Sequence, residues 1–372
     1  MKKTKSLFLS IAAAIGIFII GNIIIVAQQP NVPPDMTIDA AIRTQVIESL
    51  FKDLNDAYVF PETAKKMEAD VRRRMTNKEY DTLVSAREFA QKLTDDLQAI
   101  SKDKHIRVRF SKNAIPVRKD REEPTAEELA EQVNYMRRVN FGFEKIERLQ
   151  GNIGYVDLRG FMDPKAGAET VSAAMSFLAN TNALIFDLRQ NGGGDPEMVA
   201  LISSYLFGDK PVHLNSLYWR KGDRTEDFFT KPNLANKKFG DKDVYVLTSN
   251  RTFSGAEEFS YNLKNLKRAT IVGETTGGGA NPGGMFRLTE HFGAFIPTGR
   301  AVSPITKTNW EGSGVEPDIK APKEQALKIA YLMALNKAAE KTKDEELKNA
   351  LKRTIEQTQK ELDEMKKVKT EN

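Results

Sequence analysis

Apolar residues recur with a helical period through the first third of the chain beyond its N-terminal segment. In SAREFAQKLTDDLQAI, Phe89, Leu93 and Leu97 are four residues apart, which places them on one face of a helix. The segment PETAKKMEADVRRRM also reads as a helix, because its proline stands at a favoured entry position. HIRVRF alternates in the manner of a strand. Residues 37–140 are therefore predicted to form a mainly helical N-terminal domain.

A different pattern begins near residue 141, where short apolar runs alternate with helical segments. IGYVDLR, ALIFDLR, DVYVLTS and ATIVGE read as strands, and helices are predicted from about Pro164, from Pro196 and after Ser254. Runs that are apolar throughout, such as ALIF, are typical of strands covered on both faces. Residues 141–322 are predicted to form a mixed α/β core.

The last segment, residues 323–372, is predicted to be a helical tail. It carries a narrow apolar stripe, made of Leu347, Leu351, Ile355, Leu362 and Met365. The stripe fits a helix that lies on its own domain, and it also fits a short coiled-coil contact with another chain. An oligomer formed through this helix is therefore one of the two expectations.

The N-terminus has the pattern of an export signal. Lys2, Lys3 and Lys5 precede SLFLSIAAAIGIFIIGNIIIVA, which carries no charge. This stretch is about long enough to span a bilayer if it is not cleaved. Residues 1–27 are predicted to be a signal peptide or a signal anchor, followed by a proline-containing linker over 28–36. The rest is expected outside the cytoplasm, as a periplasmic, secreted or membrane-anchored protein.

Composition narrows the possible chemistry. The chain has no cysteine, which excludes disulfides, cysteine nucleophiles and thiolate metal sites. The net charge of +5 comes from 56 basic and 51 acidic residues without a long basic block, so no nucleic-acid partner is predicted. The three histidines, His105, His213 and His291, are far apart and form no metal-binding motif. No metal and no cofactor are predicted.

The segment TFSGAEEF supports two interpretations of Ser254. Glu257 follows Ser254 at the spacing of a capping box, so the serine could hold only a helix end. The position between an apolar strand and a helix also suits a serine nucleophile, although Thr252 shows that the motif is not GxSxG. A nucleophilic serine requires a base and donors for the oxyanion that develops during attack.

Candidates for those two parts are present elsewhere in the chain. The loop QNGGGD, between a predicted strand and Pro196, can expose backbone N–H groups to an anion, or it can be a simple tight turn. GETTGGGANPGG forms a second glycine-rich loop. His105 stands where a helix gives way to a strand, and it is either a base at the edge of a cleft or a surface histidine.

The order of DLRQNGGG, TFSGAEEF, GETTGGGA and WEGSGVEPDI resembles the tail-specific, or C-terminal-processing, serine protease superfamily. The likeness is greater to its interphotoreceptor retinoid-binding-protein-like and tricorn-like branch, and YVFPE and LQAISKDKHIRVRF resemble the former specifically. The resemblance spans roughly residues 37–319. It implies a crotonase- or ClpP-like β-β-α core with an N-terminal helical cap and a C-terminal helical tail.

The resemblance also implies site residues. Ser254 matches the nucleophile, and the stretch TTGGG carries no lysine where many superfamily members have one in TFGKG. The tricorn-like branch uses histidine and glutamate instead, which match His105 and Glu311. Two departures are Lys104, where that branch has serine, and the lack of an inserted PDZ module. The positions that match the oxyanion hole are Gly193, Gly194 and Gly255.

The function expected from this resemblance is that of an exported serine peptidase acting on a peptide or protein substrate. A triad of Ser254, His105 and Glu311 would carry the reaction. Two alternatives remain at this point. The scaffold could carry an apolar ligand without catalysis, or the same triad could serve another acyl hydrolase.

Overall fold

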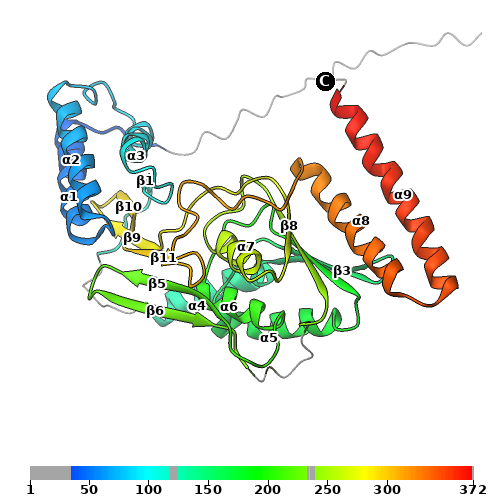
Figure 1. Ribbon diagram of the computed structural model, residues 1–372. Helices are drawn as coiled ribbons and strands as arrows, with labels where there is room; N and C mark the ends of the chain where they lie inside the picture. Colours follow the sequence, from blue (N-terminus) through cyan, green and yellow to red (C-terminus); the bar gives the residue numbers. More distant parts are fainter. Residues whose placement is uncertain (1–34, 118–124, 233, 235–238, 371–372) are drawn as a thin grey trace, which may run out of the picture. The chain divides into compact units, whose positions relative to one another are not determined.

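A computed structural model describes residues 35–117, 125–232, 234 and 239–370 (Figure 1). The predicted signal segment, residues 1–27, and nearly all of the predicted linker lie outside the described residues. Among the described residues, no helix is both long and apolar enough to cross a membrane.

Three helices at the start of the described chain share one apolar core. They are α1 (Ala40–Ala57), α2 (Pro61–Thr76) and α3 (Ala86–Ser101). The strand predicted from HIRVRF is β1 (Arg107–Phe110), and it pairs with β10 (Phe292–Pro297), which in turn pairs with β9 (Gly283–Arg287). Buried residues of β10 join the core of α1–α3. The core of these three helices therefore includes residues of a hairpin from beyond residue 141.

A six-stranded mixed sheet forms the centre of the second region, which confirms the predicted α/β class. Its strands run in the order β12-β8-β7-β4-β3-β2. All neighbours are parallel except the antiparallel pair β2 and β3. The strands are β2 (Phe143–Leu149), β3 (Ile153–Leu158), β4 (Ala183–Asp187), β7 (Asp243–Thr248), β8 (Thr270–Gly273) and β12 (Ile319–Lys320).

Helices cover both faces of this sheet, as the fully apolar strands predicted (Figure 1). Within β4, Leu184 and Phe186 pack with one group of helices, whereas Ala183 and Ile185 pack with α8 (Lys323–Lys341). The first group consists of α5 (Pro164–Phe177), α6 (Pro196–Ser204) and α7 (Gly255–Asn265). Since successive side chains in a strand point to opposite faces, a single apolar run supplies both cores.

The remaining elements flank this sheet. A three-stranded sheet has the order β11-β5-β6, where β5 is His213–Trp219, β6 is Arg224–Phe229 and β11 is Gly299–Val302. Helix α4 (Ala126–Arg138) and a 3-10 turn, η1 (Asn140–Gly142), lead into β2.

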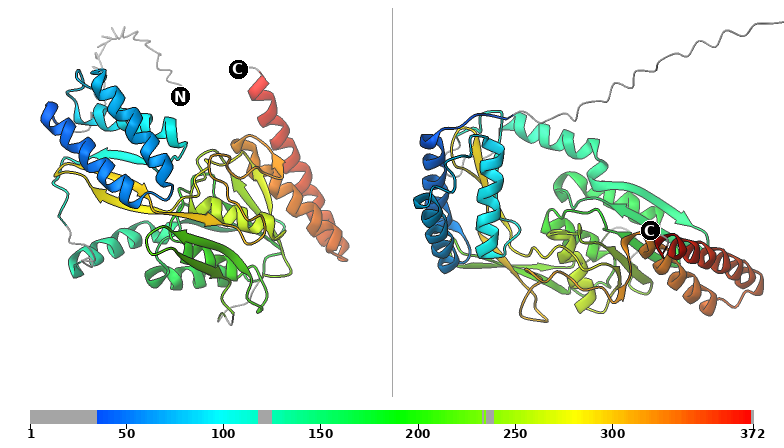
Figure 2. Two further views of the ribbon diagram at one scale, coloured as in Figure 1. Left: turned by 60° about the vertical axis from the view of Figure 1, so that its left-hand side comes forward. Right: turned by 90° about the horizontal axis from the view of Figure 1, so that it is seen from above.

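The C-terminal tail is a helical hairpin of α8 and α9 (Glu345–Thr370). Figure 2 shows α9 alongside α8, and Leu351 and Leu362 of the predicted stripe are buried. Leu347, at the start of the stripe, is 42% exposed. The stripe therefore serves mainly to pack the tail on its own domain.

A buried carboxyl on α7 gives a prediction about stability. Glu258 is 5% exposed, and burial raises its pKa from 4.5 to about 8. Between these values the folded chain holds a proton that the unfolded chain has lost, so folding becomes less favourable as pH rises. The free energy of unfolding should fall by roughly 1.4 kcal/mol per pH unit relative to Glu258→Gln.

Urea unfolding of wild type and Glu258→Gln at several pH values from about pH 5 to about pH 8 measures this difference. Glu356→Gln, an exposed position on α9, is the matched control and should follow the wild-type curve. Parallel curves for wild type and Glu258→Gln would show that Glu258 does not take up a proton on folding.

Candidate active site

The first glycine loop follows β4 and packs directly on the start of α7. Gly193 and Gly194 have φ of 104° and 142°, values that favour glycine. A Cβ atom on Gly194 would lie 2.0 Å from the carbonyl oxygen of Phe161, and one on Gly193 would lie 2.7 Å from the amide nitrogen of Gly255. Only glycine therefore allows the backbone of this loop to approach the α7 terminus so closely.

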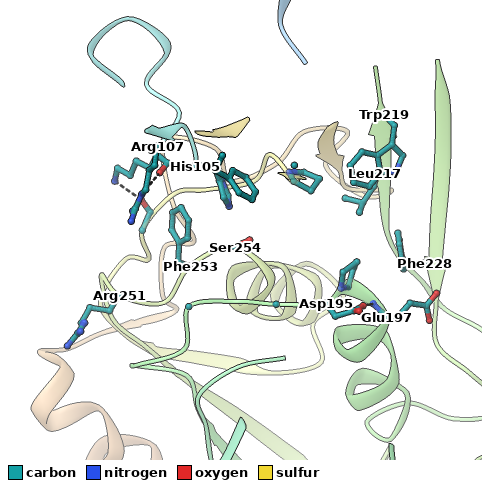
Figure 3. A pocket seen from close by; sticks show the side chains of 18 of the residues that line it. His105, Arg107, Asp195, Glu197, Leu217, Trp219, Phe228, Arg251, Phe253 and Ser254 are labelled. Carbon is teal, nitrogen blue, oxygen red and sulfur yellow. Dashed lines mark hydrogen bonds between the residues drawn. The ribbon is translucent and has the colours of Figure 1, made fainter. Parts of the chain in front are cut away.

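Ser254 occupies the turn between β7 and α7 in a strained conformation, with φ 53° and ψ −122°. Such values are costly for a residue with a side chain, and they are typical of functional turns between a strand and a helix. The amide of Glu257 donates to the carbonyl oxygen of Ser254 (2.8 Å). The Ser254 side chain points into the adjoining pocket (Figure 3).

Glu257 holds this turn in place, as its capping-box spacing predicted. Its carboxylate is fully buried, and Oε2 accepts hydrogen bonds from the amides of Ser254 (2.9 Å) and Gly279 (2.8 Å). Oε1 accepts from Thr276 Oγ1 (2.5 Å) and from the amide of Gly278 (2.6 Å). Burial raises the pKa of Glu257, and these four bonds oppose the rise. One carboxylate thus joins the Ser254 turn to the second glycine loop.

The three predicted oxyanion donors differ in their surroundings. The amide of Gly193 donates to Asn191 Oδ1 (2.8 Å), and Asn191 Nδ2 donates to the carbonyl oxygen of Leu158 (2.9 Å). The Gly193 N–H therefore already has an acceptor within the loop, and its place in the oxyanion hole stays a prediction. A Cβ atom on Gly255 would lie 3.0 Å from the amide nitrogen of Gly194, so the amides of Gly194 and Gly255 are neighbours beside Ser254.

His105 lies between α3 and β1, with its side chain 10% exposed. Its ring packs on Phe253 and Phe295, with centroid separations of 4.6 and 5.8 Å. Burial and the positive charge of Arg107 lower the pKa of His105 to about 4, so the imidazole is neutral near pH 7. Hydrogen bonds among the described residues do not include one between His105 and Ser254.

Two carboxyl groups lie beside the imidazole. Asp103, which is 1% exposed, places Oδ1 3.9 Å from His105 Nδ1 and accepts the His105 amide on the same oxygen (3.0 Å). Oδ2 of Asp103 accepts from the Tyr58 hydroxyl (3.2 Å) and from Asn281 Nδ2 (2.9 Å). Asp103 was not among the site residues predicted from the sequence, although it stands only two residues before His105.

The predicted residue Glu311 joins the same cluster. Its Oε2 accepts from the Ala280 amide (2.5 Å), and one ligating atom each of Asp103, His105 and Glu311 lie within 4.8 Å of one another. Burial and the neighbouring Asp103 raise the pKa of Glu311, and burial raises that of Asp103. The three side chains could supply one nitrogen and two oxygens to a cation such as Zn²⁺. The same arrangement lets carboxylates orient an imidazole.

The second glycine loop has no room for a lysine side chain. Gly278 has φ 81°, and a Cβ atom on it would lie 3.0 Å from the carbonyl carbon of Gly312. A Cβ atom on Gly279 would lie 2.3 Å from the Phe253 ring and 2.7 Å from His105. The His105 and Phe253 rings therefore fill this space. Lys104, the departure noted in the sequence, donates its ammonium to the carbonyl oxygen of Gly277 (2.5 Å).

His105 and Ser254 line one pocket of about 1010 Å³. Arg107 and Arg251 lie on the His105 side of Ser254 in Figure 3. An apolar wall made of Leu217, Trp219 and Phe228 lies on the opposite side. The pocket sits at the carboxyl ends of β4, β7 and β8, where parallel sheets commonly bind ligands.

Two family models match the chain. The model described as peptidase family S41 matches residues 152–321, and the N-terminal domain of Peptidase_S41 in eukaryotic IRBP matches residues 36–143. The chain thus matches the models of two domains that one class of peptidases shares. It belongs to peptidase family S41.

Curated relatives agree with this placement. Carboxyl-terminal-processing peptidase 2, chloroplastic, of Arabidopsis thaliana is 30% identical over 174 residues, which cover 46% of this chain and 32% of the relative. Carboxyl-terminal-processing peptidase 1, chloroplastic, of the same organism is 27% identical over 191 residues, which cover 51% of this chain and 37% of the relative. The chain thus spans about a third of the length of these relatives.

One solved structure with the same fold is a candidate peptidase from Parabacteroides merdae. It has a TM-score of 0.54 and 17% sequence identity, and the match covers 79% of this chain and 96% of that chain. At this identity the likeness concerns the fold.

Proposed function

We propose that this protein is a serine peptidase that hydrolyses peptide bonds with Ser254 as nucleophile, His105 as base and Glu311 as the carboxylate that orients His105. The observation that carries the proposal is that a neutral His105, with ligating atoms of Asp103 and Glu311 within 4.8 Å of its own, lines the same pocket as Ser254. A base must be unprotonated to accept a proton, and the lowered pKa of His105 provides that state at neutral pH.

The proposed reaction proceeds in two halves. His105 takes the hydroxyl proton as Ser254 Oγ bonds to the substrate carbonyl carbon, and the amides of Gly194 and Gly255 stabilise the oxyanion. His105 then gives the proton to the leaving nitrogen, which departs as the amine and leaves an acyl-serine. Water, activated by His105, releases the acid and restores Ser254. His105 must approach Ser254 past Phe253, and catalytic hydrogen bonds often tighten only when substrate binds.

Export is the second part of the proposal. It rests on Lys2, Lys3, Lys5 and the uncharged stretch after them. Mass spectrometry of the mature N-terminus in a membrane fraction and in a soluble fraction separates a cleaved signal peptide, periplasmic or secreted, from a retained membrane anchor. An intact N-terminus on protein confined to the cytosol would contradict export.

Labelling with a fluorophosphonate probe tests the proposed nucleophile. The probe forms a covalent bond with an activated serine, so wild type should be labelled and Ser254→Ala should not. A folded wild type that stays unlabelled would contradict the triad and favour a non-catalytic carrier of an apolar ligand. A labelled protein that cleaves p-nitrophenyl esters but no peptide would favour another acyl hydrolase.

The pH dependence of kcat/KM provides a prediction about the carboxylates. Glu311 must be ionised to stabilise the imidazolium, and burial and the charge of Asp103 both raise its pKa. Activity should therefore rise with pH beyond the ordinary range of a glutamate. Asp103→Asn removes one negative charge, which lowers the pKa of Glu311. The rising limb of the profile of kcat/KM against pH should therefore move to lower pH.

Steady-state rates across a pH series check this shift. Tyr58→Phe is the matched control, because it removes a hydrogen bond to Asp103 and keeps the charge. Its rising limb should stay close to that of wild type. A limb that moves to higher pH in Asp103→Asn would show that the charge of Asp103 does not act on Glu311.

A further inference from the structure

Three arginines line the active-site pocket. Arg107, Arg109 and Arg251 line the pocket, and all three are exposed. In the part of the chain that the structure describes, none of the three forms an ion pair with an aspartate or glutamate. The Arg107 Nε donates to the carbonyl oxygen of Lys104 (3.2 Å), which leaves its terminal nitrogens available.

The β1 strand aligns two of these arginines. Arg107 and Arg109 are exposed, whereas Val108 between them is buried, so both side chains leave the same face of the strand. Arg107 pairs across the sheet with Phe295, on which the His105 ring stacks. Their position is therefore fixed relative to His105. Arg251 comes from the Ser254 turn and lies on the same side of the pocket as Arg107 and His105 (Figure 3).

The acidic residues of the pocket do not offset this charge. Glu226 accepts hydrogen bonds from Trp219 Nε1 (3.2 Å) and from Arg224 (3.4 Å). Glu197 pairs with Lys231 (3.0 Å). Asp195, which also lines the pocket, accepts a hydrogen bond from the amide of Glu197 (2.8 Å). Asp195 and Glu197 lie on the far side of Ser254 from Arg107 (Figure 3), and Glu226 pairs across the sheet with Leu217 of the apolar wall. The pocket thus has a cationic end with three arginines and an opposite, apolar end at which the acidic residues Asp195, Glu197 and Glu226 lie.

The proposed reaction fixes which half of a bound peptide lies at the cationic end of the pocket and which half lies at the apolar end. His105 must protonate the leaving nitrogen, so the C-terminal half of the substrate lies on the His105 side. The acyl half then lies toward Leu217, Trp219 and Phe228. The leaving half therefore extends toward the three arginines. Guanidinium groups bind carboxylates with charge-assisted hydrogen bonds.

We propose that Arg107, Arg109 and Arg251 form a carboxylate-binding subsite for the leaving half of the peptide, and that the preferred substrate has acidic side chains after the scissile bond and apolar residues before it. This inference rests on the proposed peptidase function and specifies its substrate class. A free C-terminal carboxylate close to the scissile bond has the same chemistry and is the other source to be distinguished.

The test uses six peptides with the same acyl half, Ala-Leu-Phe. The leaving half is Ala-Glu-Glu-Ala, Ala-Gln-Gln-Ala or Ala-Lys-Lys-Ala, each made as a free acid and as an amide. For wild type, kcat/KM should fall in the order Glu, Gln, Lys, and the amides should keep that order. A preference that depends only on the free terminus would assign the subsite to the C-terminal carboxylate and overturn the proposed preference for acidic side chains.

Single arginine-to-glutamine changes at residues 107, 109 and 251 should each lower kcat/KM for the Glu peptide by about two- to fivefold, as expected for exposed charge pairs. For Arg109→Gln and Arg251→Gln the change should appear mainly in KM, and the Gln peptide should be nearly unaffected. Raising salt from about 0.05 M to about 0.5 M should reduce the Glu preference. Arg148→Gln, an exposed position on β2, is the matched control and should behave as wild type.

Binding to Ser254→Ala separates this inference from the function on which it rests. Fluorescence anisotropy with labelled peptides should show the same order of affinities without hydrolysis. Charge-selective binding combined with a wild type that cleaves no peptide would contradict the peptidase and leave the subsite standing. Cleavage by wild type with equal kcat/KM for the Glu, Gln and Lys peptides would overturn the subsite and leave the peptidase standing.

Discussion

Replacing Ser254 with alanine is expected to lower kcat for peptide hydrolysis by about 10⁴- to 10⁶-fold, because the remaining oxyanion donors and binding contacts give only residual catalysis. The free energy of unfolding should change little. The hydroxyl faces the pocket, and the strained backbone at φ 53° is equally costly for serine and alanine. Hydrolysis of fluorescently labelled casein, together with urea unfolding, measures both quantities.

Ser260→Ala provides a matched control for this change. Ser260 lies in the same helix, is fully buried and donates its hydroxyl to the carbonyl oxygen of Ala256 (2.8 Å). It should retain near wild-type kcat and lose about 1 kcal/mol of stability at most. A Ser254→Ala protein that keeps more than roughly a tenth of the activity would rule out Ser254 as the nucleophile.

The second large effect is expected at Glu257. Glu257→Ala leaves four buried donors without their acceptor, namely the amides of Ser254, Gly278 and Gly279 and the Thr276 hydroxyl. Removing one side of such a buried network costs about 3–5 kcal/mol. The Ser254 turn and the second glycine loop lose the group that joins them, so kcat should fall strongly in the molecules that remain folded.

Glu257→Gln separates the charge from the shape of this side chain. The side-chain amide of this variant keeps one acceptor oxygen. Its free energy of unfolding should therefore lie between those of wild type and Glu257→Ala. Glu258→Gln is the neighbouring control. Glu258 is also buried, but it takes no part in the hydrogen bonds that join Glu257 to this turn. Near pH 6 this control should keep its activity. Equal urea midpoints for wild type and Glu257→Ala would show that the network does not hold the turn.

Much of the fold follows from local patterns. The period of Phe89, Leu93 and Leu97 predicted α3, and all three side chains are buried. The apolar run ALIF predicted a strand covered on both faces, and β4 has that position in the sheet. These elements could be predicted because the spacing of apolar residues reflects which face is buried, and burial dominates their stability. The division at residue 140 stays a prediction, because β9 and β10 reach the helical domain from far along the chain.

The sequence by itself determined the residue types of the site: the absence of cysteine, Ser254 before a helix, two glycine loops, and His105 and Glu311 with no lysine in TTGGG. Tertiary structure alone decided which groups meet. It placed Asp103 beside Glu311 and His105, and it paired the Gly193 amide with Asn191 in a hydrogen bond. It also packed the rings of Phe253 and His105 against Gly279. The physical reason is that a hydrogen bond or a pKa depends on separations of a few ångström between groups far apart in sequence, and only the packed chain sets those distances.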